Sequence, residues 1–268
     1  MTLFNTRELR PEIAAIVESD KLFTKLPTSL LSVSSDAKTV KGEKQGVLTG
    51  ILYLSPADLI SERLNLCPYA GIAGCKTGCL NTAGRGAFSN VQRARIRKTL
   101  FWWQHHEAFM CLLMRDIRKL RRKAKRDNMT LAIRLNGTSD IQWEKQYFGH
   151  PKTTLIEKFP TVQFYDYSKV PARSVPDNYH LTFSYSGVAE FQPVVKKQMD
   201  FNPDTNLAVV FHKVPAFVMY KTTNVAIRVI DGDASDIRFN DPTGVIVGLT
   251  AKGKAKNDRS GFVVTTGA

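Results

Sequence analysis

The stretch Leu131-Ala-Ile-Arg-Leu135, followed at once by Asn136-Gly-Thr-Ser-Asp140, decides the predicted fold. Its first half is apolar and favours a buried β-strand, whereas its second half is a polar turn that contains glycine. The same order of an apolar strand and a polar loop begins at residues 46–54 and recurs later in the chain. Further strands are predicted at residues 162–167, 180–185, 207–211, 225–230 and 245–249.

Strands that alternate with helical stretches and end in polar loops are typical of an α/β protein with a mainly parallel sheet. We therefore expect an α/β fold, either a TIM-like barrel or a partial (β/α) barrel. Helical connections become rare after residue 160, so the second half should be irregular. Functional residues are expected at the carboxyl ends of the strands.

We predict a single α/β domain at residues 46–268, because no linker rich in Pro, Gly or Ser divides the chain. Residues 1–45 are expected to form an irregular N-terminal lead-in with one short helix at residues 11–19. Two segments of the domain are unusual in composition, namely a Cys-rich loop at 66–89 and a basic helix at 91–126.

The chain has 268 residues, and 43% of them are hydrophobic, which is enough for a packed core and excludes disorder as the main state. No run approaches the roughly 18 apolar residues of a membrane span. Charged residues interrupt the N-terminus where a signal peptide is apolar. We therefore expect a soluble cytosolic protein that contacts no membrane.

Positive charge is concentrated in one segment. The formal net charge is +14, and residues 91–126 contain twelve basic residues against Glu107 and Asp116. Because acids for i,i+4 pairing are scarce, nucleic-acid phosphates are the expected partners, although a solvated helix face is the ordinary alternative. Trp102 and Trp103 could stack on unpaired bases or belong to the core. The residues predicted to bind nucleic acid are Arg93, Arg97, Arg115, Arg118, Arg121, Arg122 and Lys125.

Three cysteines, Cys67, Cys75 and Cys79, lie within 13 residues of a Gly-rich loop, which can turn three thiolates toward one metal ion. A Zn²⁺ ion would need a fourth ligand from Cys111 or one of the five histidines. An iron–sulfur cluster held by three cysteines would instead leave one iron open. The alternative is that the thiols are buried small hydrophobic groups. Cys111 lies in an apolar run and is expected in the core.

Two acidic loops follow predicted strands, and in a barrel-like sheet both would face the same mouth. Asp140 of the first loop and Asp231 or Asp233 of the second are predicted to divide into a nucleophile and a general acid/base. Helix capping and Asx-turns are the alternative roles for these residues. The residues predicted to bind the substrate are Asn136, Ser139, Glu144 and Asp166.

Five motifs occur together between residues 45 and 265. They are Thr49-Gly-Ile-Leu-Tyr-Leu-Ser-Pro-Ala57, Cys67-Pro68 with Gly74-Cys75 and Cys79-Leu80, Gly84-Arg85-Gly86, Arg134-Leu-Asn-Gly-Thr-Ser-Asp140, and Asp241-Pro with Gly244-Val-Ile-Val-Gly248. In these motifs the chain resembles a group of bacteriophage and prophage proteins labelled gene product 88. The resemblance implies a viral protein located in the host cytoplasm.

A more distant resemblance is to phage enzymes that exchange guanine in DNA for 7-deazaguanine, relatives of the tRNA-guanine transglycosylases. It implies a base-modifying transglycosylase with bound Zn²⁺, which acts on nucleic acid and most readily on DNA. The early position of the Cys-rich loop resembles radical S-adenosylmethionine enzymes, which implies an iron–sulfur cluster with S-adenosylmethionine. A third hypothesis is a DNA- or RNA-binding phage protein without enzymatic activity, which serves replication or host takeover.

Overall fold

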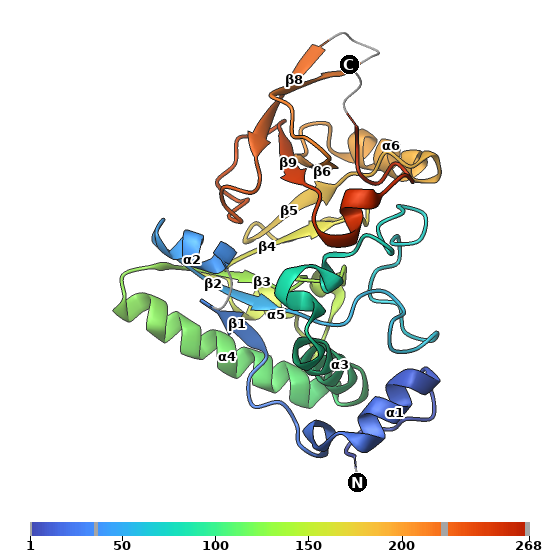
Figure 1. The fold of residues 1–268 in the computed structure, drawn as a ribbon. Coiled ribbons are helices and arrows are strands. Elements are labelled where there is room, and N and C mark those ends of the chain that lie inside the picture. Colours follow the sequence, from blue (N-terminus) through green and yellow to red (C-terminus); the bar gives the residue numbers. More distant parts are fainter. Residues whose placement is uncertain (1, 35–36, 221–224, 266–268) are drawn as a thin grey trace.

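One nine-stranded sheet runs through the whole computed structural model, which describes residues 2–34, 37–220 and 225–265 (Figure 1). The order across the sheet is β1-β2-β3-β4-β5-β6-β9-β8-β7. Seven strands coincide with predicted ones, and the short strands β1 and β7 were not predicted. The bounds are β1 (Leu31–Val33), β2 (Val47–Leu52), β3 (Thr130–Arg134), β4 (Gln163–Ser168), β5 (Tyr179–Ser184), β6 (Leu207–Phe211), β7 (Phe217–Tyr220), β8 (Val225–Asp231) and β9 (Ile246–Thr250).

Seven neighbouring strands, from β2 across to β8, run parallel, and only the outermost strands β1 and β7 are antiparallel to their neighbours. The prediction of an α/β fold with a mainly parallel sheet is therefore confirmed. The described strand order is compatible with a barrel, but it includes no pairing that closes one. Because parallel strands end on the same side, the loops that follow them leave from one edge of the sheet, which we call the carboxyl edge.

The sheet has two packed faces. All six residues of β2 are buried, as expected for a parallel strand covered on both sides. On one side, the outer face, Leu48 and Ile133 pack in the main hydrophobic core with the helices. On the other side, the inner face, Val47 and Tyr165 pack against Ile237. The segment 232–241, which follows β8, therefore crosses the inner face.

The basic segment forms two helices, α3 (Ser89–Gln104) and α4 (His106–Arg126). Helical backbone is interrupted at His105, which has φ −137° and ψ 50°. The His105 ring packs against the rings of Phe4 and Phe101, at centroid distances of 5.9 and 6.1 Å. These contacts fix the break, and both helices then pack on the outer face.

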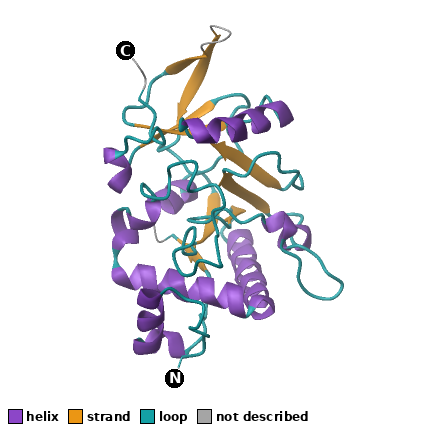
Figure 2. Ribbon diagram, turned by 90° about the vertical axis from the view of Figure 1, so that its right-hand side faces the viewer, coloured by secondary structure: helices purple, strands orange, loops and turns teal. Residues whose placement is uncertain are grey.

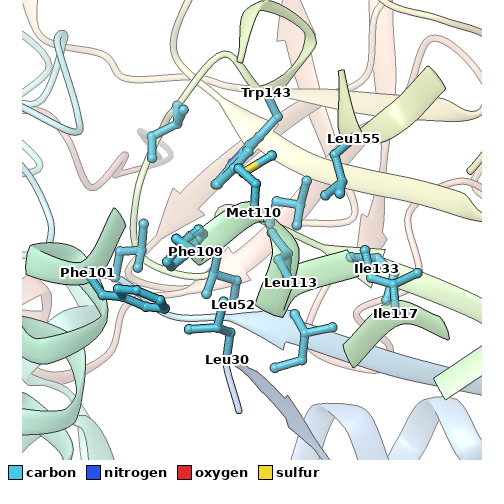
Figure 3. Close-up of a cluster of buried hydrophobic side chains, with 14 of the residues drawn as sticks. Leu30, Leu52, Phe101, Phe109, Met110, Leu113, Ile117, Ile133, Trp143 and Leu155 are labelled. Carbon is cyan, nitrogen blue, oxygen red and sulfur yellow. The ribbon is translucent and has the colours of Figure 1, made fainter. Parts of the chain in front are cut away.

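The apolar stripe of α4 fills the main core (Figure 3). The helical spacing predicted burial, and the structure confirms it for Phe109, Leu113, Ile117, Leu120 and Ala124. Figure 3 shows this stripe with Leu52 and Ile133 of the sheet and with Trp143. The expectation that Cys111 is in the core was wrong, because Cys111 is exposed. Position 111 lies midway between the buried positions 109 and 113, so it is on the opposite side of the helix.

The described part of the first 45 residues packs onto the sheet. They contain α1 (Pro11–Ser19), β1 and α2 (Ala37–Glu43), and α1 coincides with the predicted short helix. Val17 and Leu30 are part of the main core. Within the described residues, no helix is both long and apolar enough to cross a membrane.

Helices are sparse in the second half of the chain, as predicted. The described α-helices after α4 are α5 (Leu155–Lys158) and α6 (Gln192–Phe201), and residues 169–178 link β4 to β5 without a helix. In Figure 2 most helices gather in the lower part of the molecule, and α6 lies across the upper part. The 3-10 helices are η1 (Lys21–Thr24), η2 (Leu80–Thr82), η3 (Gly84–Ala87), η4 (Trp143–Lys145), η5 (Ala189–Phe191) and η6 (Gly253–Asn257).

We predict that Leu113→Ala lowers the free energy of unfolding by about 2–5 kcal/mol, because Leu113 is fully buried and the truncation leaves a cavity. Urea unfolding followed by circular dichroism measures this change. Cys111→Ala on the exposed side of the same helix is the control and should change stability by less than about 0.5 kcal/mol. Equal effects of the two substitutions would contradict the packing of α4 described above.

Candidate functional site

The Cys-rich loop between β2 and α3 lies on the carboxyl edge and contacts the loops after three other strands. The Cys67 thiol donates to the Thr138 carbonyl after β3, at 3.9 Å. The Ser186 hydroxyl after β5 donates to a carbonyl of the loop at 2.8 Å. A Cβ on Gly78 would lie only 3.3 Å from the Cβ of Ala255, after β9, so this close approach favours glycine. The loop therefore joins the ends of four parallel strands.

The thiols of Cys67, Cys75 and Cys79 are close enough to interact electrostatically with one another. Burial raises the pKa of all three thiols, and that of Cys67 to about 12. Two of them donate to backbone carbonyls, while the Cys79 sulfur accepts from the Asn81 N–H at 3.5 Å. Across the described residues, no three His, Cys, Asp or Glu side chains converge as metal ligands. To bind one ion, the thiols would have to turn away from these backbone partners.

A buried lysine lies beside the thiols. Lys169 follows β4, and its Nζ donates to the Ser184 carbonyl and hydroxyl at 3.0 and 2.9 Å and to the Tyr185 carbonyl at 3.3 Å. The rings of Phe191 and Phe262 lie 5.4 and 5.3 Å from the same nitrogen. These contacts satisfy all three ammonium protons and hold the charge in place.

Two cations, Lys169 and Arg95, interact electrostatically with the thiols. Lys169 interacts electrostatically with Cys67 and Cys75; burial lowers the lysine pKa, and these neighbours oppose the effect. Arg95 of α3 interacts with Cys79, and its guanidinium lies 5.2 Å from the ring of Tyr53. A positive field of this kind stabilises thiolates and other anionic groups.

In the described part of the chain, the charged groups that interact electrostatically with these thiols are Asp140, Lys169 and Arg95, and neither Cys111 nor any of the five histidines is among them. His212 is on the same edge, where it lines a cleft of about 330 Å³ with Arg259. Of the charged groups that interact with the thiols, only Asp140 is of a type that could join them as a ligand.

Asp140 belongs to a buried network beside the Cys-rich loop. Its carboxylate accepts from the Ser168 hydroxyl at 2.8 Å and from the Lys169 N–H at 2.7 Å. Arg173 lies 3.8 Å from Asp140 and binds both carboxylate oxygens of Glu144, at 3.0 and 2.5 Å. Burial raises the pKa of Asp140, while these donors and Arg173 oppose the shift. Asp140 and Glu144, both predicted site residues, are thus brought together by one arginine.

Asn136 and Ser139 are buried and bonded within their own turn. The Asn136 side-chain oxygen accepts from the Ser139 hydroxyl, the Ile141 N–H and the Trp143 indole at 2.9, 3.0 and 3.1 Å. Asp166 accepts from the Asn136 N–H at 2.7 Å, and burial raises its pKa to about 7. These contacts build the turn, and substrate binding by these residues stays a prediction.

Asp231 is the last residue of β8 and Asp233 follows that strand, near the other end of the strand order from β3. The Asp231 carboxylate accepts from the Asp233 N–H at 2.8 Å, which is an Asx-turn contact. Asp233 accepts from the Thr250 N–H and pairs with Lys252 at 2.5 Å. Burial raises the pKa of Asp233, but the bonds with Thr250 and Lys252 outweigh this effect and hold the pKa below its usual value. Among the described contacts, none joins either residue to Asp140.

The predicted nucleic-acid-binding residues fall into two groups. In the first group, Arg93 lies 3.3 Å from Asp20, Arg97 donates to the Leu22 carbonyl, and Arg115 donates to another carbonyl of the same N-terminal segment. The second group is exposed on α4 and has no acidic partner within the described parts of the chain. It consists of Arg118, Arg121, Arg122 and Lys125.

Sequence reasoning missed Lys169, Arg95 and Arg173, which surround the thiols and Asp140. Lys169 lies just beyond the predicted strand at residues 162–167. Its position at a strand end, where functional residues are expected, was the sequence feature that could have identified it. Arg95 was counted with the basic segment, although it is buried and donates to Asn81. Arg173 lies in a loop without a recognisable motif.

The sequence matches the protein family described as Gene product 88 over residues 29–266. The chain therefore belongs to this family of phage proteins, which confirms the predicted phage resemblance. No curated protein and no solved structure matches the chain. The resemblance to transglycosylases gains no support from these comparisons.

We predict an order of thiol reactivity in the reduced, metal-free protein. Iodoacetamide should modify the exposed Cys111 first and Cys67 last, because the thiolate is the nucleophile and burial raises the Cys67 pKa to about 12. The Cys67 rate should rise about tenfold for each unit between pH 7 and pH 9, since the thiolate fraction does. Mass spectrometry of the peptides measures both rates. If Cys67 reacts as fast as Cys111, the loop is not buried as described.

Proposed function

We propose that this member of the gene product 88 family is an iron–sulfur enzyme whose cluster is held by Cys67, Cys75 and Cys79. The observation that carries the proposal is the close placement of three mutually interacting thiols at the carboxyl edge of a parallel sheet, with no fourth cysteine or histidine among the described groups that interact with them. With one iron left open to S-adenosylmethionine, such a cluster supplies one-electron chemistry.

The surroundings of the thiols fit an anionic group. Lys169 is buried and, in the described contacts, hydrogen-bonds to neutral oxygens only. A buried ammonium without a bonded carboxylate is unfavourable unless another negative charge lies close by. Asp140 is one such charge, and thiolates bound to a cluster would add more beside Lys169. The Asn81 N–H already points at the Cys79 sulfur.

The chain's own residues would shield and orient the reacting groups. Phe191 and Phe262 flank Lys169 and exclude water from that side. Arg173 holds Asp140 and Glu144 in fixed positions, where Asp140 accepts from the Lys169 N–H. The cleft beside His212 and Arg259 lies on the same edge of the sheet.

The transglycosylase hypothesis stays a weaker prediction. It needs Asp140 close to Asp231 or Asp233, and within the described residues these acids bond to different loops. It also needs Zn²⁺ with a fourth ligand, and among the described groups that interact with the thiols only Asp140 is of a suitable type, although its carboxylate already accepts from Ser168 and Lys169.

We predict that the protein, reconstituted with iron and sulfide without oxygen, is brown and holds about four Fe per chain. Cys75→Ala should lose most of the iron, because two thiols do not hold the cluster. Iron analysis and the visible spectrum measure this, and S-adenosylmethionine should alter the electron paramagnetic resonance spectrum of the reduced cluster.

Cys111→Ala is the matched control and should retain the wild-type iron content, because this thiol is exposed on α4. A protein that takes up one Zn²⁺ and no iron, or a Cys75→Ala variant with full iron content, would overturn the iron–sulfur proposal.

A second proposed function, binding of nucleic acid with DNA favoured, rests on α4. Arg118, Arg121, Arg122 and Lys125 are exposed along one helix and lack acidic partners within the described residues. Phosphates are the polyanion that such a row of cations neutralises. Location in the host cytoplasm, where phage and host nucleic acid occur, is part of the same proposal.

We predict that replacing Arg118, Arg121 and Arg122 with Gln flattens the plot of log affinity against log salt by about two to three units, because fewer counterions are released. Fluorescence anisotropy with single- and double-stranded DNA and RNA measures the slope. The control replaces Arg7, Lys25 and Lys213, which removes equal charge from exposed positions off α4 and should change the slope less. An unchanged slope in the α4 variant would rule out this surface.

A further inference from the structure

Buried polar atoms without a hydrogen-bond partner are concentrated on the inner face of the sheet. Of eleven such atoms in the described parts of the chain, five belong to Arg134, Tyr167, Arg238 and Asp241, and two of these five, Arg238 Nη1 and Asp241 Oδ2, face each other as an ion pair at 3.2 Å. Native proteins satisfy nearly all buried polar groups, so the three remaining donors call for a partner such as water or a ligand.

The side chains of Arg134, Tyr167, Arg238 and Asp241 lie close to one another. The Arg134 guanidinium lies 4.8 Å from the centroid of the Tyr167 ring. Tyr167 also interacts electrostatically with Arg238, Asp236 and Asp241. Arg134 and Tyr167 come from neighbouring strands, while the other three residues lie in the segment that crosses the inner face.

Each arginine has an acidic partner and an Nε–H without a hydrogen-bond acceptor. Arg134 Nη1 donates to Asp236 at 2.8 Å, and its Nε lies 4.0 Å from Asp166 Oδ1, which is an ion-pair distance but too long for a hydrogen bond. Arg238 lies 3.2 Å from Asp241 and donates from Nη2 to the Ser235 carbonyl at 2.5 Å, while its Nε–H has no acceptor. With the Tyr167 hydroxyl there are three unused donors, and two of them are charged.

We propose that these three donors bind the acid group, a phosphate or a carboxylate, of a small-molecule substrate. Arginine N–H groups and a tyrosine hydroxyl are the donors that proteins use for such oxyanions. The donor atoms are shielded from solvent, so the backbone of a nucleic-acid duplex does not reach them. Binding of an anion at this site does not require a cluster. Only the assignment of that anion as a substrate rests on the proposed iron–sulfur function.

A continuous row of side chains leads from this site to the thiols. Arg134 interacts electrostatically with Tyr53, which comes just after β2. The Arg95 guanidinium lies 5.2 Å from the Tyr53 ring and interacts with Cys79. A substrate with its acid group between Arg134 and Arg238 would therefore extend along Tyr53 toward the Cys-rich loop.

The test is calorimetric titration of the full-length, metal-free protein with inorganic phosphate and, separately, with succinate, at constant ionic strength in chloride. Arg118, Arg121 and Arg122 are first replaced by Gln, so that anions do not bind to α4. We expect saturable binding of at least one of the two anions at one site, and the anion that binds identifies the acid class. Tyr167→Phe should weaken this binding about tenfold or more, because one hydrogen bond to a charged group is lost.

Tyr147→Phe is the matched control, because Tyr147 is exposed and its hydroxyl lies outside the site. This variant should retain the affinity of its parent. Without anion, Tyr167→Phe should melt at or above the temperature of its parent, since it removes a buried hydroxyl that has no partner. Weakened anion binding together with an undiminished melting temperature supports the site.

Three results would overturn the proposal. They are no saturable binding of either anion, equal affinity in the Tyr167→Phe variant, or equal weakening by Tyr147→Phe. In the first case the polar groups of the inner face bind water only. Loss of iron binding in the reconstitution experiment, with anion binding intact, would reject the cluster and leave the anion site standing.

Discussion

The candidate site depends on one backbone hydrogen bond between neighbouring parallel strands. The Gly137 N–H, just after β3, donates to the Leu52 carbonyl at the end of β2, at 2.9 Å. A Cβ at residue 137 would lie 2.6 Å from that carbonyl oxygen, so only glycine allows the turn to close here. The turn then lets the Asp140 N–H donate to the Leu66 carbonyl at 2.7 Å, which brings Asp140 beside Cys67.

Buried charge is concentrated at the carboxyl edge and on the adjoining inner face, and its pairing differs from place to place. Arg173 forms a bidentate pair with Glu144, which compensates its desolvation. Arg134 pairs with Asp236 and lies 4.0 Å from Asp166, Arg238 pairs with Asp241, and the Nε–H of each arginine has no hydrogen-bond acceptor. Lys169 interacts electrostatically with Asp140, but its ammonium bonds no carboxylate among its described contacts. Because a buried charge that lacks a bonded partner costs several kcal/mol, these incompletely bonded groups are where we propose that ligands bind.

The sequence predicted the fold class and seven strands because apolar runs that end in polar loops repeat along the chain. It predicted the buried stripe of α4 from helical spacing, but it placed Cys111 in the core because an apolar run does not reveal which side of a helix a residue occupies. It also grouped Arg95 with the exposed cations of the basic segment. Burial of that arginine depends on Asn81, which belongs to the Cys-rich loop and not to the helix.

The inner-face donors escaped prediction for a different reason. Arg134 looked like an interruption in an apolar strand, and Asp236 lies about a hundred residues further along the chain. Only the fold shows that the segment after β8 crosses the inner face of β3 and β4. Electrostatic partners that are so distant in sequence leave no local pattern, whereas the three cysteines lie in one loop and could be recognised by spacing.

The two proposed binding surfaces lie at opposite ends of the parallel strands. α4 has 21 residues and is therefore about 30 Å long. Its cationic C-terminal half leads into the amino end of β3, as Figure 1 shows, while the Cys-rich loop lies at the carboxyl edge. A nucleic acid bound along Arg121 and Arg122 would thus be held away from the thiols. The unused donors on the inner face are also shielded from solvent, so a nucleic acid does not reach them. In the two proposals, nucleic acid is therefore a docking partner on α4, and the reacting molecule is a small acid that binds separately on the inner face of the sheet.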